Sequence, residues 1–298
     1  MRKCLLSFAI VGGGPTGVEF SAELHDIIKE DLARLYPDLV KDYRITVYDV
    51  APTVLSMFDE KLGEYAMKTL NREGVEFRTE HHIQSLRKGP PRAIAQNEDV
   101  KDEQTCFTMD IKEEGEVGTG MVVWSTGLMM NPFVDKALSR IQNLSDSQIK
   151  LDRSKIAAGN LKWTVKKNPS NGSIITDDKL RLILEPEGDQ QDKPRAIMDD
   201  VFAVGDCAVM EDTQYPATAQ VASQKAEWLA KRLNKGDLES NTFHWKNMGV
   251  MAYIGNWNAI LQSSGGNVSG RTAWFIWRGA YLTKAVSWRN KILIPMYW

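Results

Sequence analysis

Residues 8–24 read FAIVGGGPTGVEFSAEL, and this stretch decides the fold of the N-terminal part of the chain. Gly12, Gly14 and Gly17 follow an apolar run at G-x-G-x-x-G spacing and precede a segment with helical periodicity. In such a loop the first glycine permits a tight turn, the second lets phosphates approach the backbone, and the third allows the helix to pack on the sheet. The helix N-terminus presents unpaired amide hydrogens and a favourable dipole to a pyrophosphate. We therefore expect a dinucleotide site here, with Gly13 among its binding residues.

A second strand, residues 44–48, ends in Asp49. An acidic side chain at this position accepts hydrogen bonds from the ribose hydroxyls of a dinucleotide, and its charge disfavours the additional phosphate of NADP. The sequence therefore favours NADH over NADPH, although a strand-end turn residue would give the same pattern. A helix over residues 60–73 and a strand over residues 75–79 complete the expected βαβαβ half-domain.

Composition limits the classes of function that remain. The chain has 298 residues, enough for two domains, with 43% hydrophobic and 26% charged residues, as is typical of a globular protein. The formal net charge of −2 argues against nucleic acid as the main partner. Three cysteines stand far apart without a C-x-x-C pair, and the four histidines lack metal-ligand spacing. We expect neither a metal site nor a thiol redox pair.

The C-terminal segment is basic and rich in tryptophan. From Ser240 onward there is no Asp or Glu, whereas six Lys or Arg and six of the nine Trp fall there. Residues at three- and four-residue intervals predict one helix with an aromatic side over residues 271–298; they are Trp274, Trp277, Tyr281, Ala285 and Trp288. Its apolar runs are far shorter than the ~20 residues of a spanning helix. This pattern is typical of peripheral binding to anionic lipid. Packing on the protein's own body, or on a second copy in a homodimer, is the alternative.

Three further segments end in short polar or glycine-containing motifs. Residues 122–127 form an apolar strand that ends in Thr-Gly, and residues 201–208 form another that ends in Gly-Asp. Residues 215–233, YPATAQVASQKAEWLAKRL, are helix-like and carry two glutamines one turn apart. Together with the glycine loop and residues 47–62, they resemble flavoproteins with two dinucleotide-binding domains. They are most similar to the type II (alternative, rotenone-insensitive) NADH:quinone oxidoreductases of fungal and plant mitochondria and of bacteria.

This resemblance implies an α/β fold with three regions. Residues 1–127 would form a Rossmann-like NADH-binding domain, residues 128–235 the C-terminal part of an FAD-binding domain, and residues 236–298 a membrane-association and quinone-side region. The implied cofactors are FAD and NADH. The implied reaction passes a hydride from NADH to FAD and then two electrons to a membrane quinone without pumping protons. The implied location is peripheral, on the mitochondrial inner membrane.

The resemblance also assigns roles to individual residues. Those implied to bind a cofactor, besides the glycine loop and Asp49, are Thr126, Gly127, Gly205, Asp206, Ala219 and Gln220. Gln220 and Gln224 would frame the quinone headgroup, and Tyr281 would lie close to the quinone route. Glu19 would pass a proton to reduced quinone, or merely complement the helix dipole; both interpretations stay open. The flavin performs the hydride transfer, so no nucleophile or metal is needed.

One feature departs from the family pattern. Family members begin with an earlier glycine fingerprint that holds the ADP part of FAD, whereas this sequence starts at the second one. We therefore expect this chain to hold flavin poorly or not at all. Two alternatives follow: a catalytically inert fragment that binds NADH or lipid, and a related FAD-dependent NAD(P)H oxidoreductase of the apoptosis-inducing-factor type.

Overall fold

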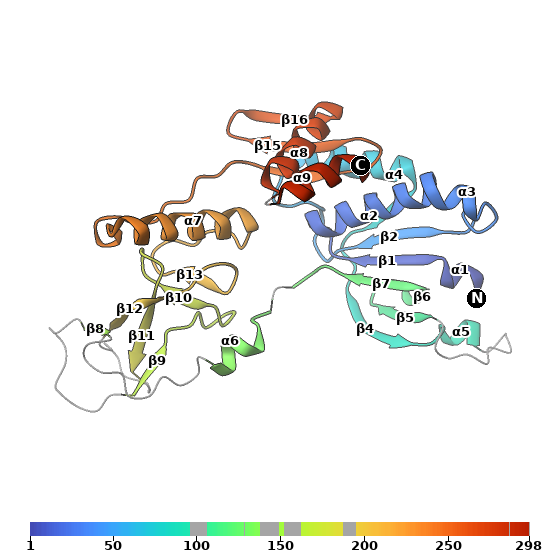
Figure 1. The fold of residues 1–298 in the computed structure, drawn as a ribbon. Helices are drawn as coiled ribbons and strands as arrows, with labels where there is room; N and C mark the ends of the chain where they lie inside the picture. Colours follow the sequence, from blue (N-terminus) through green and yellow to red (C-terminus); the bar gives the residue numbers. More distant parts are fainter. Residues whose placement is uncertain are drawn as a thin grey trace. The chain divides into compact units, whose positions relative to one another are not determined.

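The computed structural model describes residues 1–95, 106–127, 129–137, 149–151, 162–186, 195–285 and 287–297. The chain divides into two compact units (Figure 1). The first contains residues 1–127 and 247–298, and the second contains residues 128–246. The C-terminal segment from Asn247 therefore folds with the N-terminal part of the chain. The assignment of residues 128–235 and 236–298 to separate functional regions stays a prediction.

A four-stranded parallel sheet in the order β3-β2-β1-β7 forms the centre of the first unit. Its strands are β1 (Ser7–Val11), β2 (Arg44–Tyr48), β3 (Val75–Arg78) and β7 (Met121–Trp124). Helices α2 (Pro15–Ile27) and α4 (Glu60–Glu73) connect consecutive strands. This is the βαβαβ arrangement of a Rossmann-like domain, so the predicted fold class is confirmed.

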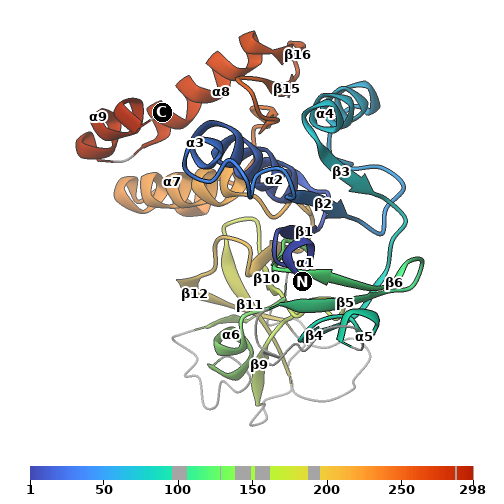
Figure 2. The same ribbon diagram turned by 90° about the vertical axis from the view of Figure 1, so that its right-hand side faces the viewer.

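Other elements cover both faces of this sheet. Successive side chains of β1 point to opposite faces, so they belong to two different hydrophobic clusters. Ile10 packs with Val18 and Ala22 of α2, and all three are fully buried. Ala9 and Val11 pack on the other face, against the sheet formed by β4 (Ile83–Lys88), β5 (Phe107–Ile111) and β6 (Gly115–Thr119). Both views show α2 and this antiparallel sheet on opposite sides of β1 and β2 (Figures 1 and 2).

Local signals define the two helices of the half-domain. The Asp59 side chain accepts a hydrogen bond from the Lys61 amide at 3.1 Å, and α4 ends at Gly74 in the left-handed conformation. Helix α2 has no acidic side chain in its first turn and begins with Pro15. It continues through a π-helical turn, Ile28–Leu32, into the short helix α3 (Ala33–Leu35). Short helices α1 (Arg2–Leu5) and α5 (Arg92–Ala95) complete this part.

The returning segment of the first unit forms an antiparallel sheet followed by two helices. The strands are β14 (Val250–Tyr253), β15 (Ala259–Ser263) and β16 (Gly266–Gly270), and the helices are α8 (Arg271–Lys284) and α9 (Trp288–Tyr297). Ala252, Ile260 and Trp274 belong to the same hydrophobic core as Ile10 and Val18. The two ends of the chain therefore share one core.

The prediction of one continuous helix over residues 271–298 is wrong. Helix α8 ends at Lys284 because Ala285 adopts an extended backbone, with φ −60° and ψ 122°. Trp288 consequently does not continue the helix face that carries Trp274 and Trp277. Trp274 is buried in the core, whereas Trp288 is 80% exposed.

The second unit is a mixed sheet with one long helix. The strands are β8 (Ile149–Leu151), β9 (Trp163–Val165), β10 (Ile174–Thr176), β11 (Arg181–Pro186), β12 (Ala196–Phe202) and β13 (Ala208–Met210). Its helices are α6 (Pro132–Ala137), α7 (Ala219–Lys235) and the 3₁₀ turn Leu238–Ser240. The order is β13-β10-β11-β12-β8, with β9 paired to β11. Arg181 and Asp177 form a buried ion pair at 2.7 Å.

Candidate functional site

The glycine loop joins β1 to α2 so tightly that side chains would not fit at Gly12 and Gly17. A Cβ on Gly17 would lie 1.9 Å from the carbonyl oxygen of Gly12, and Gly12 itself has φ +118°. A Cβ on Gly14, by contrast, would meet no atom within 4 Å. Gly14 is the N-cap of α2, so the first amides of the helix lie beside open space. This is the geometry that a pyrophosphate requires.

Asp49 connects the end of β2 to the glycine loop. One carboxylate oxygen accepts a hydrogen bond from the Gly13 amide at 2.5 Å, and the other accepts one from the Ala51 amide at 2.7 Å. Asp49 is only half-buried. A carboxylate has about four acceptor positions, so Asp49 can still accept hydrogen bonds from ribose hydroxyls while it binds these two amides.

The end of β7 meets the same loop. The Ser125 hydroxyl donates to the carbonyl oxygens of Val11 and Gly12, at 3.0 and 3.3 Å, and so holds the loop against β7. Thr126 and Gly127 follow and are exposed. The structure thus brings these two predicted cofactor-binding residues to the glycine loop. The sequence pattern does not single out Ser125, and a small polar residue at a strand end is its only local signal.

Glu19 of α2 and Tyr281 of α8 belong to one aromatic cluster within the first unit. The Glu19 carboxylate accepts a hydrogen bond from the Tyr253 amide at 3.0 Å, and the Trp277 side chain lies near enough to favour its charged form. The Trp277 ring stacks on Tyr253, with centroids 5.4 Å apart, and lies 4.9 Å from the ring of Tyr281. Trp277 therefore joins the two predicted catalytic residues.

The cluster alters the acid–base properties of both residues. Burial raises the pKa of the Glu19 carboxyl above its ordinary value, although the Tyr253 amide and the Trp277 side chain oppose this. Burial also raises the pKa of the Tyr281 phenol, and the nearby charge of Glu19 raises it further. A carboxyl group with a raised pKa binds a proton more readily than usual, as a proton donor requires. The geometry is therefore compatible with the predicted proton role.

The second unit contains a cavity of about 20 Å³ at the start of α7. Gly205 and Asp206 line it together with Thr218, whose hydroxyl caps α7 by accepting a hydrogen bond from the Val221 amide at 3.4 Å. The α7 amides and the Gly-Asp turn therefore lie together, as the resemblance implies for a flavin site. Ala219 is the first residue of the helix.

Lys225 is a further charged residue at this cavity. It is 3% exposed, and its ammonium group has one long hydrogen bond, 3.5 Å to the Ala208 carbonyl oxygen. Burial lowers its pKa. A buried cation with so weak a partner is suited to an anionic group in the cavity. The sequence shows only one Lys in an amphipathic helix, so its burial was not predictable from local pattern.

Gln220 and Gln224 lie on one face of α7, as their spacing predicts. The Gln220 amide oxygen accepts a hydrogen bond from the Trp245 indole at 3.1 Å. The Gln224 side chain pairs with the backbone of Lys246, accepting at 3.0 Å and donating at 2.9 Å. Both glutamines therefore hold the segment that follows α7 against the helix. Their role toward a quinone stays a prediction.

Among the residues that the structure describes, no group of three or more His, Cys, Asp or Glu side chains is arranged to hold a metal ion. None of the helices in this part of the chain combines the length and apolarity that a bilayer crossing needs.

Comparison with known families agrees with this geometry. Residues 2–155, just over half of the chain, match the family model described as pyridine nucleotide-disulphide oxidoreductase. The chain therefore belongs to the pyridine nucleotide-disulphide oxidoreductase family. Residues 247–298 match a second family model, described as NDH2 C-terminal domain.

Curated relatives and a solved structure support the same placement. The chain is 34% identical to a probable NADH dehydrogenase of Dictyostelium discoideum, matching all of this chain and 54% of that protein. It is 32% identical to the internal alternative NAD(P)H-ubiquinone oxidoreductase A1, mitochondrial, of Arabidopsis thaliana, covering 51% of it. The structure of NDH2 from Plasmodium falciparum in complex with NADH matches with a TM-score of 0.69 at 17% identity, over 98% of this chain and 64% of that one. The chain thus spans about half the length of the curated relatives it matches.

Proposed function

We propose that this chain is the NADH- and quinone-side part of an NADH:quinone oxidoreductase that uses FAD. One observation carries the proposal. The returning C-terminal segment folds onto the Rossmann-like domain and brings Tyr281 into the cluster that holds Glu19. The resemblance implies that Glu19 lies near the nicotinamide and quinone pockets and Tyr281 close to the quinone route, and the two residues are far apart in the sequence.

Each cofactor has residues that fit it. NADH would bind at the glycine loop, with Asp49 toward the ribose and Thr126 and Gly127 beside the loop. FAD would bind at Gly205, Asp206, Ala219 and Gln220, where Lys225 supplies a positive charge. When bound, the flavin accepts the hydride and passes electrons onward, and this is chemistry that the protein side chains cannot perform. The protein would orient the groups and exclude water.

Glu19 would hold the proton that reduced quinone takes up. Its raised pKa and its contact with Trp277 favour this role over simple complementation of the helix dipole. Tyr281 would lie along the same route. Gln220 and Gln224 would frame the quinone headgroup from α7.

We also assign a lipid-facing surface to α8 and α9. Trp274 and Trp277 turn inward, so the predicted lipid contacts shift to other side chains. The exposed apolar residues of these helices are Phe275, Ile276, Tyr281, Trp288, Ile292 and Met296. Arg289 and Lys291 lie among them, which suits an anionic membrane surface. Relatives carry mitochondrial names, so we place the protein peripherally on the mitochondrial inner membrane. A second copy of the chain, in a homodimer, is the alternative occupant.

Spectroscopy of the purified chain tests the proposal. In excess FAD, which compensates for the weak flavin retention expected from the sequence, we expect flavin absorbance, bleaching of that absorbance by NADH, and its return when a soluble quinone is added. Sedimentation analysis without lipid then distinguishes a monomer from a homodimer. A protein that binds NADH but never retains flavin would refute the oxidoreductase proposal for this chain and support an inert NADH-binding fragment.

A further inference from the structure

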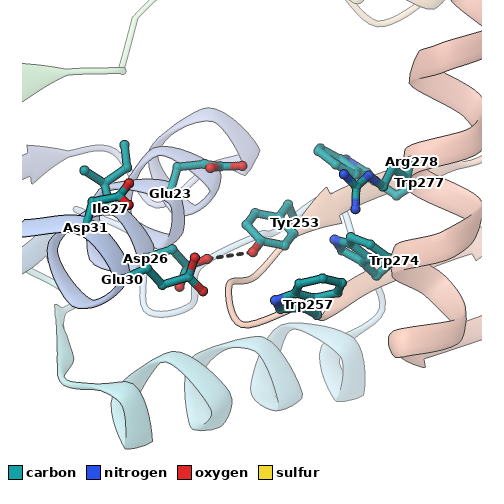
Figure 3. Close-up of a pocket in the computed structure, with 10 residues that line it drawn as sticks. All are labelled: Glu23, Asp26, Ile27, Glu30, Asp31, Tyr253, Trp257, Trp274, Trp277 and Arg278. Atoms are coloured by element: carbon teal, nitrogen blue, oxygen red, sulfur yellow. Dashed lines mark hydrogen bonds between the residues drawn. The ribbon is translucent and has the colours of Figure 1, made fainter. Parts of the chain in front are cut away.

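A cavity of about 250 Å³ opens between α2, the segment after β14, and α8 (Figure 3). One wall is acidic and the other is aromatic. The acidic side chains come from α2 and its π-helical extension; they are Glu23, Asp26, Glu30 and Asp31. None of the proposed NADH or FAD contacts uses this cavity.

Four carboxylates form the acidic wall, whereas Arg278 is the one Lys or Arg side chain among the residues that line the cavity. Asp26 is well satisfied, because its carboxylate accepts from the Tyr253 hydroxyl at 2.6 Å and from the Asn256 amide at 3.2 Å. No ion pair within the described residues includes Glu23, Glu30 or Asp31. Burial and the charges of nearby carboxylates raise the pKa of Glu23. A bound cation would relieve this repulsion.

Three tryptophan rings and the Tyr253 ring line the same cavity, and of these Trp257 leaves the most surface exposed, at 52%. The rings of Trp257 and Trp274 lie 4.9 Å apart, tilted by 35°, and Tyr253 stacks on Trp277. The Arg278 guanidinium lies 4.5 Å above the Trp274 ring, so this wall already receives a cation from the protein itself. Aromatic faces attract cations through the ring quadrupole, and Trp does so most strongly.

The turn between β14 and β15 holds Trp257 at the cavity. Asn256 and Trp257 are its two central residues, with φ values of +47° and +62° as such a hairpin turn requires, and the Asn258 amide closes it by donating to the Gly255 carbonyl oxygen at 2.9 Å. Trp257 is also 52% exposed, which is uncommon for so large an apolar ring. Core packing alone does not account for such a position, since an exposed ring buries little surface there.

We propose that this cavity binds an organic ammonium cation. The carboxylates would neutralise the charge, and the tryptophan and tyrosine faces would contact the methyl or methylene groups around the nitrogen. A hydrated metal ion would use the carboxylates but could not use the aromatic wall, because hard cations take oxygen ligands. Ammonium groups of this kind occur on soluble amines and on choline and ethanolamine lipid headgroups. The site shares Tyr253 and Trp277 with the Glu19 cluster, but it includes neither Glu19 nor any of the proposed NADH and FAD contacts.

Calorimetry on the full chain tests the proposal with choline and its uncharged isostere 3,3-dimethyl-1-butanol. We expect saturable choline binding and roughly five- to thirtyfold weaker binding of the isostere, as cation–π attraction requires. Equal binding of the two compounds, or no binding of choline, would overturn the proposal.

Matched variants locate the site. Glu23→Gln should weaken choline binding several-fold, whereas Glu64→Gln, at an exposed position of α4, should not change it. Trp257→Gly should abolish binding; glycine suits the φ of this position, so the fold is preserved. Arg278→Gln should strengthen binding, because it removes the competing internal cation. Equal dissociation constants for Glu23→Gln and Glu64→Gln would also overturn the proposal.

Vesicles distinguish the two sources of the ligand. If the ligand is a headgroup, Trp257→Gly should lose sedimentation with phosphatidylcholine vesicles but keep sedimentation with phosphatidylglycerol vesicles. If the ligand is a soluble amine, choline should bind as expected, and Trp257→Gly should leave both kinds of vesicle binding unchanged. Either result supports an ammonium site.

Discussion

Replacement of Asp49 by alanine tests the dinucleotide site most directly. The substitution removes two hydrogen bonds, because the Asp49 carboxylate accepts from the backbone amides of Gly13 and Ala51. It is also the expected acceptor for the ribose hydroxyls of NADH. The substitution should therefore affect both the stability of the loop and the selectivity for the cofactor.

The magnitude follows from the number and exposure of these hydrogen bonds. A hydrogen bond to a charged group contributes roughly 1.5–3 kcal/mol when buried. Asp49 is only half-buried, so water replaces part of what is lost, and we expect unfolding free energy to fall by about 2 kcal/mol. Loss of the ribose acceptor should cost NADH about 1.4 kcal/mol, a tenfold change in affinity. NADPH does not lose affinity in the same way, because the repulsion of its additional phosphate disappears.

Fluorescence titration with NADH and NADPH measures the change, and thermal unfolding measures stability. Asp49→Asn keeps one oxygen acceptor, so it should retain more stability than Asp49→Ala while showing the same loss of preference for NADH. Asp38→Ala serves as a control, because the Asp38 side chain is 87% exposed and forms an ion pair with nearby Lys41. Superimposable NADH titration curves for Asp49→Ala and the parent would refute the role of Asp49.

Four further outcomes are expected. Burial raises the pKa of Glu19, so ionisation of Glu19 lowers the free energy of unfolding as pH rises through this pKa. Glu19→Gln should therefore melt at a higher temperature than the parent near neutral pH, and this difference should vanish in acid. Gln224→Ala should slow quinone reduction but leave reduction of the flavin by NADH unchanged in stopped-flow traces; slow flavin bleaching would argue against this. Lys225→Met should weaken FAD binding several-fold while raising the melting temperature of the FAD-free protein, because an apolar side chain replaces a buried charge. Trp288→Ser with Ile292→Ser should reduce sedimentation with anionic liposomes without unfolding the protein, since both side chains are exposed; undiminished sedimentation would contradict the lipid-facing surface.

Much of the first half-domain was predictable from local sequence. The bounds of β2 and α4 agree with the periodicity, and the glycine loop has the crowded geometry that its spacing predicts. The cap of α4 and the close approach of Gly17 to Gly12 depend on residues that are close in sequence, so local turn and capping chemistry specifies them. Strand β2 is predictable because its apolar residues mark it as buried, although its hydrogen bonds come from the distant strands β1 and β3.

The path of the C-terminal segment was not predictable in the same way. The tryptophan spacing correctly indicates an amphipathic helix at α8, but it does not show which surface that helix covers. Trp274 enters the core of the first unit, and the break at Ala285 turns Trp288 out of register with it. Periodicity reports that a face is apolar, and the same face suits lipid, a partner or the protein's own core.

The sequence by itself determined the dinucleotide loop, the acidic strand end and the family of the chain, because each is a short motif whose spacing carries its chemistry. Only the tertiary structure decided that Glu19 meets Trp277 and Tyr281, that Lys225 is buried, and that an acidic wall faces an aromatic one at Trp257. Such contacts join residues that are distant along the chain. They depend on how whole elements pack, and burial then sets the pKa and hydrogen bonding of each group.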